Sequence, residues 1–584
     1  MSGRIICARR LPLAVVTSQN SSYLSPPAAC KCTAITNTPI ITTNTPSIHC
    51  ITKRCFTQTK PSAKEKMRVA VVGGGVAGLS AALHLAPLVS QGLIQSPIDV
   101  YEATPARKGR SIGVGIWSTA LDPFRTSDRP SHQAVWDRMT NSGSWVGKVG
   151  YRTPSGNWLV NSKLPTTYPV VTENAAEEST AHMPGLLFIR ECDVEAALHT
   201  AVAAEEHNST IRVHCNAPVE SIMEDSSFAW SAPLVLETGQ TTERDYHFII
   251  AADGTNSQLR NTYAGHSPGE RQRLTGTSAL PSAASTDPTS DSNERESSWA
   301  EMNHQQVTFL EDRNYTVFRG NAPFDEPGSE GLNFQTWGEG GSMRFATVHM
   351  SYPSKEKRTT REEKQVWFIT IDDADIVGEN DPVKRKEMLL KAFEHWHSPI
   401  CDIVSSTPAE EILAERAIAH RFAVRPITEM NTILERIRGK RPPSSGKGPA
   451  LIFIGDAFMC IDPILAQGFS VGMEAAAALP KQIHKCLGMS YDDLMFDPYE
   501  LRSLLERRHD ERLERLTCLL RATEIVQALG QPRDGTVTGF LAKHVIRPTM
   551  RFAPSFIKTR IFDATLRYSL GLPLSGKKKE VAKG

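Results

Sequence analysis

Residues 67–86 read MRVAVVGGGVAGLSAALHLA, and this stretch decides the fold that the chain can adopt. Its apolar run, Val69–Val72, has the length and β-branched composition of a short buried strand. The residues from Val76 onward are rich in alanine and leucine, which predicts a helix. Between the two elements stand the glycines of a G-x-G-x-x-G pattern, Gly73, Gly75 and Gly78.

Each glycine of this pattern has a physical purpose where a strand turns into a helix. The first permits a tight turn, the second lets the backbone approach a pyrophosphate, and the third allows close packing of helix on strand. The amino end of the helix, at Val76 and Ala77, favours negative charge. A second apolar strand, 98–101, ends at Glu102, whose carboxylate can accept a hydrogen bond from a ribose hydroxyl. The sequence therefore predicts a dinucleotide-binding β-α-β unit.

Two later segments also follow short apolar runs. The segment 252–260 reads ADGTNSQLR and contains Asp253 and Gly254. The segment 455–468 reads GDAFMCIDPILAQG and contains Asp456, Pro463, Gln467 and Gly468. Together with the glycine turn, these segments resemble the motifs of the p-hydroxybenzoate hydroxylase-like flavin monooxygenases, in the same order along the chain.

The middle of the chain extends this resemblance. Segments such as 315–320 (YTVFRG) and 337–340 (WGEG) are similar to the salicylate-hydroxylase-like and epoxidase-like members, so the resemblance covers roughly residues 67–529. It implies that Asp456 bonds the ribityl chain of FAD, with Pro463 and the Gln467-Gly468 backbone against the flavin ring. It also implies that Asp253 and Gly254 contact the pyrophosphate.

The resemblance implies roles for two arginines, each with a structural alternative. Arg190 matches the family's arginine near the flavin phosphates, although Asp193 stands where the family has leucine, and an ordinary salt-bridge arginine is the alternative. Arg319 is a candidate for the substrate cavity, whereas the alternating Trp and Phe residues of these strands more often fill the space beneath a sheet than touch a substrate.

Two departures from the family pattern lie beside the expected flavin. Met459 replaces a histidine, and Ala466 replaces the first glycine of G-Q-G. The run Cys460–Pro463 is also similar to flavin-dependent halogenases, but the W-x-W-x-I-P motif and a suitably placed lysine are absent from the sequence.

The resemblance implies an FAD-dependent monooxygenase that uses NAD(P)H and O2. Reduced flavin would form a C4a-hydroperoxide and hydroxylate or epoxidise an aromatic or other apolar small molecule. The sequence identifies no catalytic residue, because the cofactor supplies the difficult step. Alternatives are an FAD-dependent reductase or dehydrogenase of an isoprenoid or quinone-like substrate, and a non-catalytic flavin-binding subunit.

The expected fold class is α/β: a Rossmann-type FAD-binding domain, an inserted antiparallel-sheet substrate domain and a C-terminal helical region. The boundaries expected are 67–125, 185–265 and 446–490 for the FAD-binding domain and 126–184 and 300–445 for the substrate domain. Residues 266–299 are Ser/Thr/Pro-rich and predict a disordered insertion. Helices with a basic tail are expected in 491–584, and they either pack on the core or touch a membrane surface.

Composition limits the remaining function classes. Hydrophobic residues make up 40 % of the 584, charged residues 22 %, and the formal net charge of +1 gives no indication of a nucleic-acid partner. Uninterrupted apolar runs stay below the ~18 residues of a membrane span. The eleven cysteines lack metal-ligand spacing, so we expect reduced thiols and no metal.

The first 66 residues differ from the rest of the chain. Residues 1–64 contain no acidic residue but several arginines and lysines among many serines and threonines, which is typical of a transit peptide. The sequence Arg54-Cys55-Phe56 resembles a mitochondrial processing site. We therefore expect a mitochondrial address, with a plastid address or an untargeted disordered tail as the alternatives.

Overall fold

The chain divides into two units, Met1–Lys60 and Pro61–Gly584. The computed structural model describes, within the second unit, residues 66–105, 109–164, 185–223, 231–263, 308–323, 333–338, 343–354, 360–422, 449–486, 515–516, 518–527 and 537–570. The expected transit peptide up to residue 65, the expected insertion 266–299 and the basic tail 577–579 lie outside these residues.

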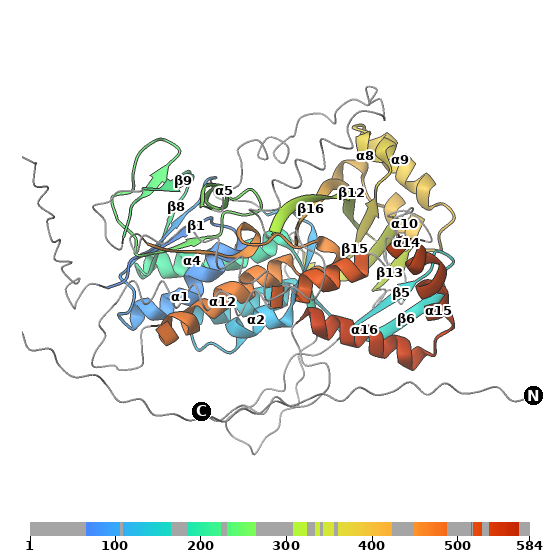
Figure 1. Ribbon diagram of the computed structural model, residues 1–584, viewed down its shortest axis with the longest axis horizontal. Coiled ribbons are helices and arrows are strands. Elements are labelled where there is room, and N and C mark those ends of the chain that lie inside the picture. Colours follow the sequence, from blue (N-terminus) through green and yellow to red (C-terminus); the bar gives the residue numbers. More distant parts are fainter. Residues whose placement is uncertain are drawn as a thin grey trace, which may run out of the picture. The chain divides into compact units, whose positions relative to one another are not determined.

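A parallel sheet forms the centre of the nucleotide-binding part (Figure 1). Its strands follow the order β17 (Ala450–Phe453), β11 (Phe248–Ala251), β1 (Val69–Val72), β2 (Ile98–Tyr101) and β8 (Ile211–His214). Each neighbouring pair is parallel. Strand β1 is buried along its whole length, which explains why it is a continuous apolar run and not an alternating one.

Helices cover one face of this sheet and a hairpin covers the other. The helices are α1 (Val76–Ser90), α4 (Glu191–His207) and α12 (Gly468–Cys486), and α1 packs against both of the others. Val69 and Val71 point to that helical core, whereas Ala70 and Val72 pack toward the hairpin. The hairpin consists of β9 (Val219–Ile222) and β10 (Leu234–Leu236).

A small antiparallel sheet and two helices extend the helical side. The strand order is β3 (Gly113–Trp117), β7 (Leu186–Arg190), β4 (Ser144–Val146). Helix α2 (Ser118–Arg125) packs on α12, and α3 (Pro130–Ser142) packs on α4.

A seven-stranded sheet forms the second large layer. Its order is β16 (Leu413–Phe422), β12 (Thr308–Ala322), β15 (Arg361–Ile371), β14 (Arg344–Pro353), β13 (Phe334–Trp337), β5 (Lys148–Arg152) and β6 (Trp158–Lys163). The pairs are antiparallel except β13 with β5. In sequence, strands β12 to β16 lie between β11 and β17. Because β11 and β17 are hydrogen-bonded neighbours in the parallel sheet, these strands form an insertion. The expected α/β fold with an inserted, largely antiparallel sheet is confirmed.

Opposite faces of the inserted sheet have different partners. One face, including Phe318 and Trp367, packs under α8 (Ala374–Gly378), α9 (Pro382–Phe393) and α10 (Ile400–Ser405). The other face, including Met350 and Val366, packs on Trp117 and Phe188 of the small sheet. The second face therefore looks toward the nucleotide-binding part.

The described C-terminal residues are helical, and their last helix lies against β5 and β6. They comprise 518–527, α14 (Val537–Leu541), the π-helical η5 (Ala542–Ile546), α15 (Arg547–Phe552) and α16 (Ser555–Ser569). Helix α16 contacts β6, and its Phe562 ring lies edge-on to Tyr151 with 5.2 Å between the ring centroids. In the described part of the chain, we find no helix that is both long and apolar enough to cross a membrane.

The burial of His84 in α1 predicts that acid destabilises the fold. Its ring packs on Phe124 and His132, and burial is the main cause that lowers the pKa of His84 to about 3, with His132 adding to the shift. The unfolded chain has the ordinary value near 6.5, so it binds more protons than the folded chain between about pH 6.5 and 3. We expect the free energy of unfolding to fall by about 2 kcal/mol between pH 7 and pH 5 through this group.

Guanidinium denaturation at a series of pH values measures this dependence. His84→Leu should flatten the pH profile, whereas His395→Leu should leave it unchanged because the His395 side chain is 89 % exposed. Equal slopes for wild type and His84→Leu would show that another group controls the acid response.

Candidate functional site

The glycine turn brings helix α1 unusually close to the sheet. Gly73 has φ +104°, and its N–H donates to the carbonyl oxygen of Tyr101 at 2.8 Å. A Cβ at Gly73 would lie 2.3 Å from the Ala252 carbonyl oxygen, and one at Gly78 would lie 1.9 Å from the Gly73 carbonyl oxygen. Both positions therefore exclude a side chain, as expected for the first and third glycines of the pattern.

The amino end of α1 has neither a side-chain cap nor an acidic residue in its first turn. Gly75 is the N-cap residue, and Val76 begins the helix. An uncapped helix start presents backbone N–H groups and a partial positive charge, the arrangement that binds phosphate. This end of α1 is therefore suited to the pyrophosphate of a dinucleotide.

Glu102 lies across the glycine turn. One carboxylate oxygen accepts from the Gly74 N–H at 2.6 Å, and the other accepts from the N–H and hydroxyl of Thr104 at 3.0 and 2.6 Å. These contacts orient the carboxylate at the end of β2. A carboxylate has further lone pairs, so Glu102 can also accept a hydrogen bond from a ribose hydroxyl. That contact stays a prediction.

Asp253 connects the second motif to the glycine turn. Its Oδ2 accepts from the N–H groups of Gln258 and Leu259 at 2.8 and 3.3 Å, at the start of α5 (Gln258–Tyr263). Its Oδ1 is buried and has no hydrogen-bond partner among the described residues. The next residue, Gly254, has φ +80°, and a Cβ there would meet nothing within 4 Å.

Asp456 is held beside the same edge by the second motif. Arg260 donates to the carbonyl oxygens of Asp456 and Ala457, each at 2.9 Å, and the Thr255 hydroxyl donates to the Asp456 carboxylate at 3.2 Å. Asp456 lies in the short helix η3 (Gly455–Ala457), directly after β17. The arginine of the A-D-G segment therefore joins two motifs that are distant in sequence.

The predicted residues Gly73, Glu102, Asp253 and Asp456 all follow the carboxyl ends of adjacent parallel strands. In open α/β sheets, this edge is where ligands bind, at the point where the connections diverge to either side. The four strand ends thus form one candidate nucleotide site.

The loop Asp462–Gly468 follows η3 in sequence, leads into α12, and contains three further predicted cofactor residues. Ala466 has φ 50° and ψ 44°, so the alanine adopts the left-handed conformation that favours glycine. Gln467 is fully buried: its Nε2 donates to the Ser569 hydroxyl at 3.0 Å, while its Oε1 has no partner in the described residues. Pro463 begins the short helix η4 (Pro463–Leu465), and Gly468 begins α12, with nothing within 4 Å of a Cβ placed there.

Met459 stands where the family has a histidine, and the described part of the structure shows no polar contact for its side chain. It is 2 % exposed and packs in an apolar cluster with Leu516, Leu519 and Leu520. The adjacent Cys460 thiol is buried, and burial, together with the charge of Asp456, raises its pKa far above the usual range. A neutral thiol of this kind is unreactive at physiological pH.

The two candidate arginines have carboxylate partners. Arg190 pairs with Asp193 at 2.5 Å and stacks on the Tyr352 ring at 4.0 Å, which is the structural alternative that the sequence left open. Arg319 pairs with Glu415, which also pairs with Arg110. Arg319 lies on the face of β12 that also carries Tyr315 and Val317, so a place at the cavity stays a prediction.

A buried polar cluster around Asp462 was missed at the sequence level. Asp462 accepts from the Tyr315 hydroxyl at 2.7 Å and from Arg313 Nε at 3.0 Å. Arg344 is buried nearby with an unpartnered Nη1, and burial lowers its pKa while Tyr315 and Asp462 oppose the shift. The only indication in the sequence was an aspartate inside an apolar run.

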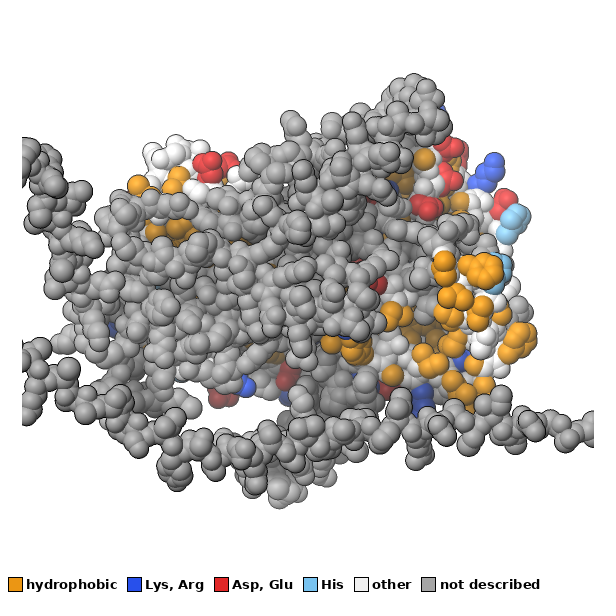
Figure 2. Space-filling model, in the orientation of Figure 1, with side chains coloured by type: hydrophobic (Ala, Val, Ile, Leu, Met, Phe, Trp, Pro, Cys, Tyr) orange, Lys and Arg blue, Asp and Glu red, His pale blue; other side chains and the backbone are white. Residues whose placement is uncertain are grey.

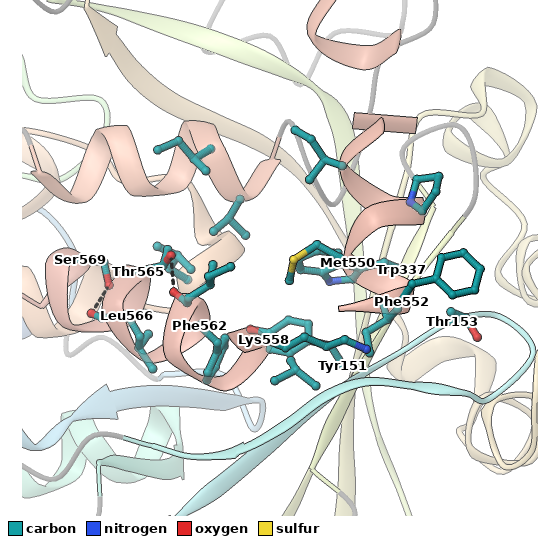
Figure 3. A pocket seen from close by; sticks show the side chains of 18 of the residues that line it. Tyr151, Thr153, Trp337, Met550, Phe552, Lys558, Phe562, Thr565, Leu566 and Ser569 are labelled. Carbon is teal, nitrogen blue, oxygen red and sulfur yellow. Dashed lines mark hydrogen bonds between the residues drawn. The ribbon is translucent and has the colours of Figure 1, made fainter. Parts of the chain in front are cut away.

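An apolar cavity of about 420 Å³ was also missed (Figure 3). Its walls include Tyr151 and Trp337 from the inserted sheet, Leu465 from the loop, and Phe562 and Leu566 from α16. The sequence did not show it because the wall combines segments from five separate parts of the chain.

The fold and the strand ends together define a candidate dinucleotide-binding site. No protein-family model matches the chain. It is 21 % identical over 490 residues to chloroplastic zeaxanthin epoxidase of an Oncidium hybrid cultivar, covering 83 % of this chain and 59 % of the relative. It is 26 % identical over 217 residues to aurachin C monooxygenase/isomerase of Stigmatella aurantiaca, covering 37 % of this chain and 45 % of the relative. The chain thus spans only about half of the length of these curated relatives.

A solved structure shares the fold: Klebsiella pneumoniae HpxO complexed with FAD and uric acid. The TM-score is 0.56 at 18 % identity, with 87 % of this chain and 98 % of that chain covered. The chain is therefore similar in sequence to an epoxidase and a monooxygenase, and it shares its fold with an FAD-binding protein.

Gly78→Ala tests the close approach of α1 to the strand. Its methyl group would overlap the Gly73 carbonyl oxygen, so the helix must shift, and we expect a loss of about 1–3 kcal/mol in the free energy of unfolding. Gly147→Ala is the control, because a Cβ there meets nothing within 4 Å and the position is exposed. Urea denaturation that shows equal losses for the two variants would contradict the packing argument.

Proposed function

We propose that the chain binds one FAD and uses NAD(P)H and O2 to hydroxylate or epoxidise an aromatic or other apolar small molecule. The observation that carries this proposal is the set of four strand ends. They place a glycine turn, a carboxylate and two aspartate motifs along one edge, opposite the face of a second sheet.

The residues at this edge fit an FAD. The N–H groups at Val76, Ala77 and Gly78 would hold the pyrophosphate, and Glu102 would accept from the adenosine ribose. The unpartnered Oδ1 of Asp253, with open space at Gly254, suits the same region.

The ring end of the cofactor would lie along the Asp462–Gly468 loop. Asp456 would bond the ribityl chain, and the backbone at Gln467 and Gly468 would donate to the pyrimidine edge. Open space at Gly468 supports this placement. Bound FAD supplies the oxygen chemistry, and the chain's residues bind it, orient it and exclude water.

The inserted sheet favours an apolar substrate. Its face toward the nucleotide-binding part carries Val317, Phe368 and Val348, and such side chains exclude water. The two relatives in sequence are an epoxidase and a monooxygenase/isomerase, and HpxO was solved with uric acid. These similarities support oxygen transfer to a small molecule.

Two further features belong to the same proposal. An organellar address follows from residues 1–64, with the mitochondrion as our interpretation and the plastid as the alternative, which the chloroplastic relative favours. Peripheral membrane contact through α14–α16 follows from their exposed apolar residues. Imaging the full chain fused at its carboxyl end to a fluorescent protein separates the two organelles.

Asp456→Ala and Gly75→Ala should each weaken FAD binding by about tenfold or more. The first removes a carboxylate at the ribityl position, and the second adds a methyl group where the pyrophosphate approaches the backbone. Bound flavin per protein, measured by absorbance after gel filtration, reports the loss. Asp372→Ala is the matched control, since Asp372 is exposed and far along the chain from the motifs. Full flavin content in both test variants would refute the binding assignment.

Turnover under ¹⁸O₂ tests the reaction class. With NAD(P)H and a panel of aromatic and isoprenoid compounds, we expect one labelled oxygen atom per product molecule. Reduced products without label would identify the reductase alternative. Bound FAD that NAD(P)H never reduces would identify a non-catalytic flavin subunit.

A further inference from the structure

The apolar cavity reaches from the loop of the nucleotide site to the surface of the C-terminal helices. At its inner end are Leu465 and Ser569, and Ser569 accepts from Gln467. At its outer end, Phe552 and Ile561 line the cavity and are also 83 % and 49 % exposed. Phe552 and Ile561 are therefore both cavity lining and protein surface, so exposed apolar side chains form part of the mouth; Figure 3 shows Phe552 there beside Lys558.

The surface around this mouth is unusually apolar. Exposed large apolar side chains on α14–α16 and η5 are Val537, Phe540, Leu541, Val545, Ile546, Phe552, Phe556, Ile557 and Ile561. Figure 2 shows hydrophobic side chains gathered on the side where Figure 1 places α14 and α15. Contiguous apolar surface of this kind marks a contact with a protein or a membrane. We call the described surface of α14–α16 and η5 the apolar face.

The sequence of these helices is also strongly basic. Residues 537–569 contain Lys543, Arg547, Arg551, Lys558, Arg560 and Arg567 against one acidic residue, Asp563. Asp563 is engaged by Arg567 at 2.8 Å. Apolar helices with an excess of basic residues complement an anionic lipid surface, because apolar burial and attraction to headgroups add together.

We infer that the apolar face rests on an anionic lipid surface and that the cavity receives its apolar substrate directly from the lipid phase. This inference rests on the proposed oxygenation of an apolar small molecule. The substrate class is an elongated, lipid-soluble molecule that enters past Phe552 and reaches Leu465. A volume of about 420 Å³ is within the usual range for small-molecule sites, and its lining is mainly aliphatic and aromatic.

Vesicle sedimentation of the FAD-bound full chain tests the surface. Wild type should bind vesicles of phosphatidylcholine with phosphatidylserine more tightly than phosphatidylcholine alone, and salt should weaken binding. Phe552→Ser with Phe556→Ser should weaken it at least about tenfold. Val383→Ser on α9 is the matched control, because Val383 is an exposed apolar residue (53 %) outside the apolar face.

Two outcomes of that experiment would overturn the inference. One is equal vesicle binding by wild type and the double variant. The other is a wild-type dimer in light scattering that the double variant dissociates without any vesicle binding, which would make the face an interface between two copies.

Fluorescence of cis-parinaric acid, a long polyene, tests the cavity itself. Thr565→Trp and Val160→Trp fill it from opposite walls, and each should reduce probe binding at least about tenfold, whereas Thr565→Val should bind as wild type does. Flavin content identifies variants whose loop remains intact. Wild-type probe affinity in either filled variant that keeps its flavin would refute the cavity assignment.

The two proposals can fail separately. If the chain binds vesicles and probe but shows no ¹⁸O transfer with any apolar compound, the proposed reaction fails and the lipid-phase site stands. If oxygen transfer occurs with soluble aromatic compounds while vesicle and probe binding are absent, the lipid-phase inference fails alone.

Discussion

The close contact of helix α1 with its surroundings is the constraint on which the nucleotide site depends. On one side, Gly78 packs so near Gly73 that no side chain fits between helix and strand. On the other, Ala77 meets Gly455 and Gly472, where added Cβ atoms would lie 2.9 and 3.1 Å away. Small residues at these crossings let α1, β1 and α12 approach, which brings the amino end of α1 beside Asp456. A larger side chain at any of them would separate the phosphate-binding end from the rest of the site.

A second constraint joins the inserted sheet to the Asp462–Gly468 loop. Asp462 and Arg313 are both 2 % exposed and form an ion pair, with Tyr315 as a third member. A buried ion pair contributes little net stability, because desolvation offsets attraction, but breaking it leaves an uncompensated charge. Its effect here is geometric: it fixes the loop that contains Pro463 and Gln467 against β12. The inserted sheet therefore helps to shape the nucleotide site as well as covering it.

Local pattern was sufficient to predict the parallel sheet and its strand-end residues. A buried strand, a glycine turn and an acidic residue each follow from neighbouring positions, so Gly73 and Glu102 could be named in advance, whereas Asp456 was named from its resemblance to a family motif. Partners from distant segments could not: Arg319 meets Glu415 only because β12 and β16 pair in the folded chain. The cavity was missed for the same reason, since helical pattern in 551–570 does not reveal what the helix covers. The domain boundaries and cofactor contacts stay predictions.

Ala466 shows how a departure from a motif can be accommodated. An L-residue in the left-handed region costs about 1 kcal/mol or more, so alanine at this position stores strain that glycine would not. The conformation persists because both neighbours are fixed, Gln467 by Ser569 and the preceding turn by Asp462. The Ala466 Cβ also lies 3.3 Å from where a side chain at Gly115 would begin, so glycine on β3 makes room for it. The loop keeps the backbone path that glycine would adopt, and the C-terminal helix α16 helps to hold it there. Support from α16 links the apolar face of the C-terminal helices to the Asp462–Gly468 loop.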